Sequence, residues 1–480
     1  MEHMKSIRSY YVIIGLILIS AMIFLCYEAS IGSLWLDDIC QINMVGKEAA
    51  PSSFIANIIE GDNNPPLSHF ITAIWMRIAP YGNMWAKLPN IVMLVLGSCF
   101  LSEAARRLYG SIAGIIALCI SISNITTIKL AAFTVRPYGM LYMLSSLFIL
   151  SKLMLLQDRE RNRSFRYMLL LGIVMLLLAY THYFGCIVIF ASFIADVFQI
   201  IIKRAPKSII APYFFLLGYI PWIIIIINKY AGSDNSFWPP TPTFYNSVLA
   251  PLHIAGNSSL VFFLFLAFLL IIILFRKKFE KELFFYGWGY FVFFSTLILT
   301  YIYSAYINPH GSIWVERYFI SVSPFLVFLS SVSADRAIDL LLKKKWQKIP
   351  AVCIALLVIV LPSAVKLNRS PVDVDERYQQ AADYIMTAND VHDPHTAIFC
   401  SSYVTHQGWD YYLTHNGKRD GKYVFYSKEI STPEDVADID VVYYFKVHKE
   451  PDEIMKSILN EEFHSVHTDT ESGVVKYERN

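Results

Sequence analysis

Long runs of apolar residues, separated by short polar loops, limit the folds that are open to this chain. A run of about 20 such residues matches a hydrocarbon core about 30 Å thick, and a helix crossing it satisfies its backbone hydrogen bonds internally. Of the 480 residues, 55% are hydrophobic and 16% are charged, against about 25% charged in an average soluble domain. The pattern predicts an all-α polytopic membrane protein.

The length criterion predicts about eleven transmembrane helices. They cover residues 9–28, 88–106, 111–128, 138–157, 167–184, 186–202, 208–228, 258–275, 284–304, 317–340 and 349–366. The first run is long enough to span and no small-residue cleavage pattern follows it, so we expect a membrane helix rather than a cleaved signal peptide.

Cationic residues concentrate in every second loop, for example at 159–166, 276–281 and 343–348. Cytoplasmic loops of membrane proteins carry an excess of Lys and Arg, so these loops and the N-terminus are predicted to be cytoplasmic. The first outer loop, residues 30–87, and the tail are then extracytoplasmic. The expected location is the cell inner or plasma membrane, with several passes.

Two short amphipathic segments of the first outer loop, 51–60 and 67–79, predict interfacial helices. Beyond the last run, strand-like and helix-like patterns alternate. We therefore expect a transmembrane domain over 1–366 and a small extracytoplasmic α/β domain over 367–480. The tail has no Gly-rich phosphate loop, so neither a nucleotide nor a nucleic-acid partner is expected.

The segment SLWLDDIC places Asp37 and Asp38 at the predicted outer edge of the membrane, just after Trp35. One interpretation is that a carboxylate caps an interfacial helix while Trp35 anchors it at the membrane surface. The other is a general base at a cavity mouth, which contributes about 10²- to 10⁴-fold in rate. The residues alone leave both open.

Several cations lie at the same predicted membrane face. Lys129 and Arg136 are seven residues apart and would share a face if their helix continued; they either snorkel or bind a phosphate. His182 is either an interior hydrogen-bonded residue or a functional group. Glu316 and Arg317 form either an interfacial ion pair or, through Arg317, a second contact for a lipid phosphate.

Cysteine and histidine spacings do not predict a metal site. The seven cysteines have no zinc-like spacing, and the tail pairs lack a ligand arrangement that selects a metal. These pairs are His392 with His395 and His464 with His467. We expect no cofactor and no metal ligands, with a divalent metal left open.

Five segments occur in order within residues 1–340: SLWLDD, NNPPLSHF, AAFTVRPYGMLYMLSSL, YTHYFG and ERYFISVSPFLVFLSS. Together they resemble the bacterial membrane glycosyltransferases of the GT-C superfamily, near the protein O-mannosyltransferase and aminoarabinose-transferase branch. The resemblance implies inverting transfer of a sugar from a polyprenyl-phosphate donor to an acceptor hydroxyl outside the cytoplasm. Such enzymes modify lipopolysaccharide, other cell-envelope glycans or proteins.

The resemblance also implies roles for individual residues. Asp37 matches the catalytic base, Asp38 stands where the family usually has Glu, and Asn64 stands where it usually has His. An arginine, Arg136 or Arg317, is implied to lie near the donor phosphate. The substrate-binding residues expected from the patterns and the resemblance are Asp38, Asn64, Lys129, Arg136, Tyr138, His182, Tyr183, Glu316, Arg317 and Tyr318.

The expected partners are a lipid-linked sugar donor, membrane lipids and a glycan, lipid or protein acceptor. The alternatives are a transporter or flippase of lipid-linked sugars and a ligase of lipid-linked glycans. Transporters carry broken spans and charges at mid-membrane depth, whereas the notable ionisable residues here lie at the predicted outer ends of spans, which favours the transferase.

Overall fold

The computed structural model describes most of the chain. The described residues are 2–46, 54–62, 64–157, 161–230, 239–274, 283–341, 350, 357, 360, 377–388, 393, 395–400, 408, 411–412, 424–426, 432–445, 453–470 and 472–480. The chain divides into two compact units. The first comprises residues 1–27, 51–72 and 87–370, and the second comprises residues 28–50, 73–86 and 371–480.

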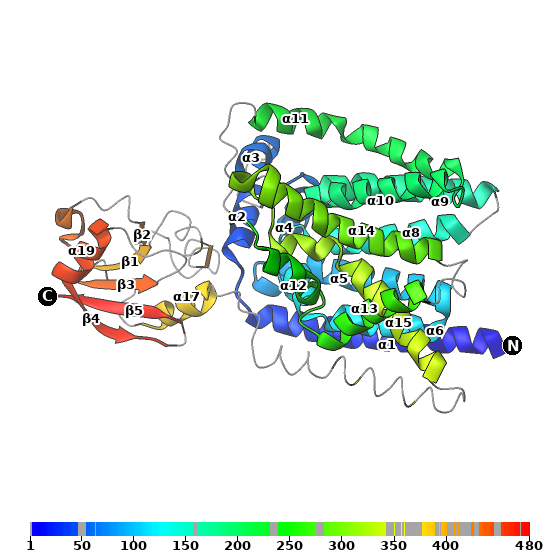
Figure 1. Cartoon of the computed structure of the whole chain (residues 1–480). Coiled ribbons are helices and arrows are strands. Elements are labelled where there is room, and N and C mark those ends of the chain that lie inside the picture. The colour runs from blue at the N-terminus through cyan, green and yellow to red at the C-terminus, as the bar shows by residue number, and fades with distance from the viewer. Residues whose placement is uncertain are drawn as a thin grey trace. The chain divides into compact units, whose positions relative to one another are not determined.

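The first unit is a bundle of long apolar helices (Figure 1). Its elements are most of α1 (Glu2–Ile31) and α5 (Asn83–Tyr109), then α3 (Phe54–Gly61), α6 (Ser111–Ser123), α7 (Ile125–Ala131), α8 (Tyr138–Gln157), α9 (Arg161–Thr181), α10 (Tyr183–Ile201), η2 (Lys207–Tyr219), α11 (Ile220–Tyr230), α12 (Phe244–Ile254), α13 (Ser259–Leu274), α14 (Leu283–Ile302), η3 (Tyr303–Ile307), η4 (Pro309–Gly311), η5 (Glu316–Ser321) and α15 (Ser323–Leu341). Helix α4 (Leu67–Ile78) is shared between the units.

Within the described residues, seven helices are long and apolar enough to cross a membrane, or up to nine if each of two bent pairs counts as one span. The prediction of a polytopic membrane protein is confirmed. The predicted span 111–128 is the pair α6 and α7, bent by 64°, and α12 and α13 form a second pair bent by 102°. The predicted span 349–366 lies outside the described residues, apart from three positions.

The predicted span 317–340 begins with a turn of 3-10 helix, η5, and continues as α15. Its last two turns carry three charged residues, Asp335, Arg336 and Asp339. The two short helices predicted within residues 30–87 are present as α3 and α4.

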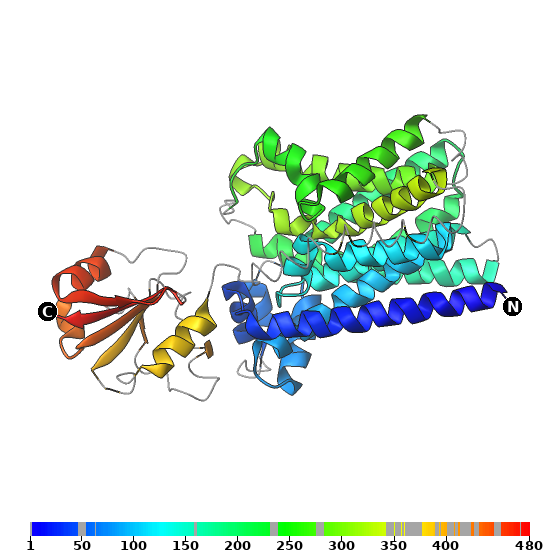
Figure 2. The ribbon, with the colours of Figure 1, turned by 90° about the horizontal axis from the view of Figure 1, so that it is seen from below.

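Neighbouring helices of the bundle pack along their lengths: α8 against α9, α10 against α14, and α15 against both α6 and α13, as Figure 1 and Figure 2 show. Small residues allow the closest approaches, since a side chain at Gly97 of α5 would lie 2.8 Å from the ring of Tyr142 on α8. The Tyr10 hydroxyl of α1 bonds to Ser102 Oγ of α5 at 2.7 Å. The interior is therefore closely packed around a few polar contacts.

The second unit contains α2 (Leu36–Val45) and the tail. The tail folds into α17 (Tyr378–Thr387), β1 (Thr396–Cys400), β2 (Val424–Tyr426), η6 (Pro433–Val436), β3 (Val441–Phe445), α19 (Glu453–Glu461), β4 (Phe463–Thr468) and β5 (Val474–Arg479). The five strands form one sheet in the order β2-β1-β3-β5-β4. Strands β2, β1 and β3 are parallel, whereas β5 is antiparallel to both β3 and β4.

The side chains of β3 point alternately to the two faces of the sheet, and each face is covered by a helix. Val442 and Tyr444 belong to the core that β3 shares with α19, whereas Tyr443 and Phe445 contact tyrosines of α17. Successive side chains of a strand point to opposite faces, so α19 and α17 lie on opposite sides of the sheet (Figure 1). The α/β pattern predicted for the tail is confirmed.

Candidate active site

A buried carboxylate, Asp62, organises the polar cluster of the first unit. It follows α3, and its Oδ1 accepts hydrogen bonds from the backbone N–H of Asn64 at 3.0 Å and from Asn64 Nδ2 at 2.9 Å. Its Oδ2 accepts from Arg136 Nη1 at 2.8 Å and contacts His69 Nε2 at 3.1 Å. Lys229 Nζ donates to the Asp62 carbonyl oxygen at 2.9 Å.

These contacts decide the charge of Asp62. Burial alone would raise the pKa of its carboxyl, but Arg136 and His69 outweigh that effect and hold the pKa well below its usual range. The side chains of Asp62 and Arg136 are 8% and 12% exposed. Asp62 is therefore an ionised counter-charge to Arg136, and a carboxylate so fully engaged is a poor proton acceptor.

The turn that carries Arg136 is fixed from α5. Asn90 Nδ2 donates to the carbonyl oxygens of Thr134 and Arg136, at 2.5 and 2.8 Å. Gly139 packs against Asn90, because a side chain at Gly139 would lie 2.9 Å from the Asn90 carboxamide. The guanidinium is thus held by a rigid turn, as bidentate or charged recognition requires.

Several aromatic side chains surround His182, which lies between α9 and α10. The ring centroid of His182 is 4.7 Å from that of Tyr318 and 6.2 Å from that of Tyr138. Its Nδ1 accepts from the Phe184 N–H at 3.2 Å, and its buried Nε2 has no hydrogen-bond partner among the described residues. This pattern fits a neutral ring that carries its proton on Nε2.

Burial, together with neighbouring charges, keeps His182 neutral. Burial, followed by the positive charges of Arg136 and Arg317, lowers the pKa of His182 to about 3. Burial also raises the pKa of Tyr318, against the opposing effect of the same two arginines. The structure therefore brings Arg136, His182, Arg317 and Tyr318 into one electrostatically connected cluster.

A cavity of about 430 Å³ adjoins this cluster in the first unit. Lys129, His253, Glu316 and Arg317 contribute the ionisable side chains of its lining. The remaining lining residues are Thr126, Thr127, Leu130, Ala250, Ile254, Asn257, Phe319, Ile320 and Ser323. The cavity thus combines two strong cations with an extensive apolar wall.

The structure narrows two interpretations that the sequence left open. Lys129 and Arg136 do not share a helical face, because α7 ends at Ala131 and Arg136 lies in the following turn. Glu316 Oε1 contacts His253 Nδ1 at 3.1 Å, so the ion pair that the structure gives Glu316 is with His253. The shared face would have required a helix that continues from Lys129 to Arg136.

The adjacent carboxylates of α2, in the second unit, have different environments. Asp38 is fully buried, and its Oδ2 accepts a hydrogen bond from the backbone N–H of Trp35 at 3.3 Å, which caps the helix. Asp37, one residue earlier, is half-buried. The capping interpretation therefore applies to Asp38.

Sequence analysis did not identify Asp62, His69 or Lys229 as site residues. Asp62 and His69 lie on either side of the NNPPL segment. The position of Asp62 directly before this candidate motif was the one sequence feature that pointed to it. Asn64 itself supports Asp62, and Tyr183 lies beside His182 with ring centroids 6.5 Å apart.

Within the described residues, no group of three or more His, Cys, Asp or Glu could hold a metal ion.

Asp62→Asn is expected to lower the stability of the protein by about 1.5–3 kcal/mol, because it removes a charge-assisted hydrogen bond to Arg136. The matched control is Glu103→Gln, whose pairs with Arg106 and Arg107 are partly exposed and contribute at most about 1 kcal/mol. Thermal unfolding in detergent compares the two. Equal loss in both variants would contradict the buried role of Asp62.

No protein-family model matches the sequence, and no curated protein is significantly similar to it. The fold, however, is similar to that of solved structures. ArnT from Cupriavidus metallidurans in the apo state aligns at 12% identity over 98% of both chains, with a TM-score of 0.63. The same ArnT bound to undecaprenyl phosphate aligns at 13% identity over 98% of both chains, with a TM-score of 0.60. The chain is thus a multi-pass membrane protein whose fold is similar to that of ArnT.

Proposed function

We propose that this protein is a glycosyltransferase that moves a sugar from a polyprenyl-phosphate donor to an acceptor hydroxyl outside the cytoplasm, with inversion. The observation that carries the proposal is the cavity in which Lys129 and Arg317 share the lining with apolar side chains. A prenyl phosphate needs a cationic contact for its headgroup and apolar surface for its chain. The likeness in fold to ArnT, which has been crystallised with undecaprenyl phosphate, supports this ligand class.

Arg317 and Lys129 are the proposed phosphate contacts. Arg136 is less suited, because its charge is already balanced by Asp62 at 2.8 Å. Arg317 both lines the cavity and acts electrostatically on His182 and Tyr318, so it connects the cavity to the aromatic cluster. His182, Tyr138, Tyr183 and Tyr318 are proposed to contact the donor.

Asp37 is the proposed general base. As the acceptor oxygen attacks the anomeric carbon, its proton passes to Asp37 and the bond from that carbon to the phosphate oxygen breaks. The polyprenyl phosphate leaves with the bonding electrons, and the arginine stabilises its charge. The role of Asp38 is to cap α2. No cofactor is required, and a divalent metal at the phosphate is compatible with the scheme.

A deletion strain tests the proposed function. Its glycans and lipids are expected to lack one sugar substituent and to accumulate the corresponding polyprenyl-phosphate sugar. The wild-type gene should restore the substituent, whereas the Asp37→Asn gene should not. An unchanged glycan profile with no accumulated donor would overturn the proposal, and donor trapped on the cytoplasmic side would favour a flippase.

Arg317→Ala is expected to weaken binding of undecaprenyl phosphate about 10- to 100-fold, because one charge-assisted hydrogen bond contributes about 1.5–3 kcal/mol. A titration of the purified protein in detergent measures this. Arg107→Ala is the control, since Arg107 is a partly exposed arginine of α5 paired with Glu103 at 2.8 Å. Unchanged affinity of the Arg317 variant would rule out the phosphate contact.

A further inference from the structure

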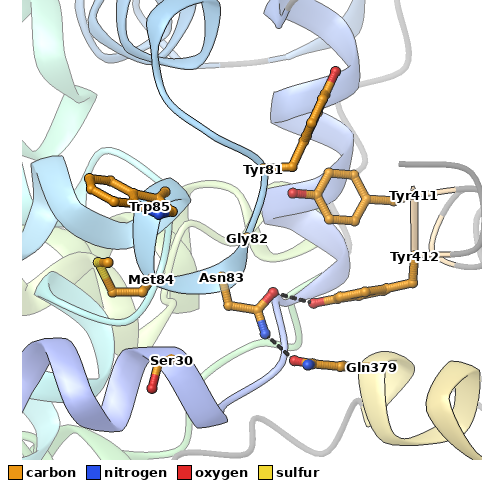
Figure 3. A pocket seen from close by; sticks show the side chains of 9 residues that line it. All are labelled: Ser30, Tyr81, Gly82, Asn83, Met84, Trp85, Gln379, Tyr411 and Tyr412. Carbon is orange, nitrogen blue, oxygen red and sulfur yellow. Dashed lines mark hydrogen bonds between the residues drawn. The ribbon is translucent and has the colours of Figure 1, made fainter. Parts of the chain in front are cut away.

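A second pocket, of about 300 Å³, lies entirely within the second unit (Figure 3). Four aromatic side chains and two carboxamides dominate its lining: Tyr81, Trp85, Tyr411, Tyr412, Asn83 and Gln379. None of its nine lining residues is Lys, Arg, Asp or Glu. The pocket therefore differs in chemistry from the cationic cavity assigned above to the donor.

The pocket has two walls from distant parts of the sequence. Residues 81–85, which include the first residues of α5, form one wall, and Gln379 with Tyr411 and Tyr412 of the tail form the other. Gly82 has φ of +139°, a conformation that favours glycine, and the rings of Tyr81 and Trp85 lie on different sides of it (Figure 3). The tail is thus needed to complete the pocket.

Hydrogen bonds join the two walls. The Tyr412 hydroxyl donates to Asn83 Oδ1 at 2.9 Å, and Asn83 Nδ2 donates to the Gln379 side-chain oxygen (Figure 3) and to the Gly32 carbonyl oxygen at 2.8 Å. Gln379 Nε2 makes no hydrogen bond within the described part of the chain, so it is available to a ligand. The pocket is pre-organised and keeps a donor for recognition.

The pocket adjoins the helix that carries Asp37. The Tyr412 hydroxyl accepts a hydrogen bond from the Leu34 N–H at 2.7 Å, three residues before Asp37. Burial, with a further contribution from the charge of Asp38, raises the pKa of both Tyr411 and Tyr412, so both rings lie within electrostatic reach of α2. A ligand held here would lie near the proposed base.

We propose that this pocket binds an uncharged pyranose ring of the acceptor, placing the acceptor hydroxyl toward Asp37. Flat aromatic faces pack against the C–H faces of a sugar ring, and the carboxamide bonds to its hydroxyls. A pocket of about 300 Å³ suits one ring, and its lack of cations disfavours a phosphorylated or carboxylated sugar. The inference rests on the proposed transferase function, because it assigns the acceptor to this site.

Saturation-transfer NMR on the full-length purified protein tests the assignment. The probes are methyl glycosides of neutral hexoses, 6-deoxyhexoses and N-acetylhexosamines, each hexose paired with its 6-phosphate. We expect at least one neutral glycoside to bind, and its phosphate to bind at least tenfold more weakly. No transfer to any neutral glycoside, or preference for the phosphates, would overturn the proposal.

Variants locate the binding. Trp85→Ala, at a side chain that is 36% exposed, should weaken the glycoside at least tenfold, and Gln379→Ala should weaken it as well. Tyr245→Ala, at an exposed aromatic of α12 outside the pocket, is the control. Binding that survives both pocket substitutions would place the sugar elsewhere and overturn the proposal.

Titration with undecaprenyl phosphate in the same samples separates the two proposals. If all pocket variants bind undecaprenyl phosphate normally but no glycoside binds to the wild type, the pocket assignment fails alone. If the wild type binds neither probe, the proposed function fails with it.

Discussion

Replacing Asp37 with Asn should reduce sugar transfer by about 10²- to 10⁴-fold while the protein stays folded and inserted. The amide has the same shape as the carboxylate but does not accept a proton from the attacking hydroxyl. The structural cost is small, because an acid in the first turn of a helix contributes only about 0.3–1 kcal/mol through the helix dipole. Single-turnover transfer from a polyprenyl-phosphate sugar measures the effect.

The neighbouring acid is the control for this prediction. Asp38 is fully buried and accepts the hydrogen bond that caps α2, so Asp38→Ala should lower the thermal midpoint more than Asp37→Asn does. Binding of undecaprenyl phosphate should be normal in the Asp37 variant, which confirms that donor and fold are intact. Wild-type turnover by Asp37→Asn would remove Asp37 from the catalytic step.

Replacing Asp196 with Ala is expected to destabilise the protein by about 3–5 kcal/mol. Asp196 of α10 pairs with Lys152 of α8, and both side chains are fully buried in the helix bundle. The Tyr213 hydroxyl donates to Asp196 Oδ2 at 2.7 Å, and Trp288 Nε1 donates to Ser192 Oγ at 2.9 Å. Removing the carboxylate leaves the Lys152 charge without its partner in an apolar surrounding.

The double variant Lys152→Met with Asp196→Leu isolates the charge effect, because replacing a buried pair by apolar residues of similar volume is often neutral or stabilising. Unfolding in mixed detergent micelles measures both variants. We expect the double variant to be closer to wild type than Asp196→Ala. If the double variant is the less stable of the two, packing rather than the unpaired charge explains the loss.

Much of the membrane architecture was predictable, because the demand for satisfied backbone hydrogen bonds in lipid acts on each segment separately. The bend between α6 and α7 was not. It occurs at Asn124, whose Nδ2 donates to the Ile254 carbonyl oxygen at 2.8 Å, and Gly256 packs against the same side chain. The bend therefore depends on a segment about 130 residues away along the chain.

The candidate site was predictable only in part. Arg136, His182 and Arg317 were expected at one face of the membrane, and the structure brings them into one cluster. The pairing of Arg136 with Asp62 was missed, because the two residues are 74 positions apart and no local pattern joins them. Because Asp62 already balances the charge of Arg136, the proposed phosphate contacts are Arg317 and Lys129.

Most of the membrane-spanning helices, the α/β character of the tail and the position of two adjacent carboxylates after the first apolar run could be predicted from the amino-acid sequence. These follow from local periodicity and from the cost of polar groups in lipid. The different environments of the two carboxylates are visible only in the tertiary structure. Asp38 is buried and accepts a hydrogen bond from the Trp35 N–H, whereas Asp37 is half-buried. The tertiary structure also brings the Tyr412 hydroxyl of the tail into a hydrogen bond with the Leu34 N–H. Local sequence patterns do not predict this contact, because the two residues are 378 positions apart.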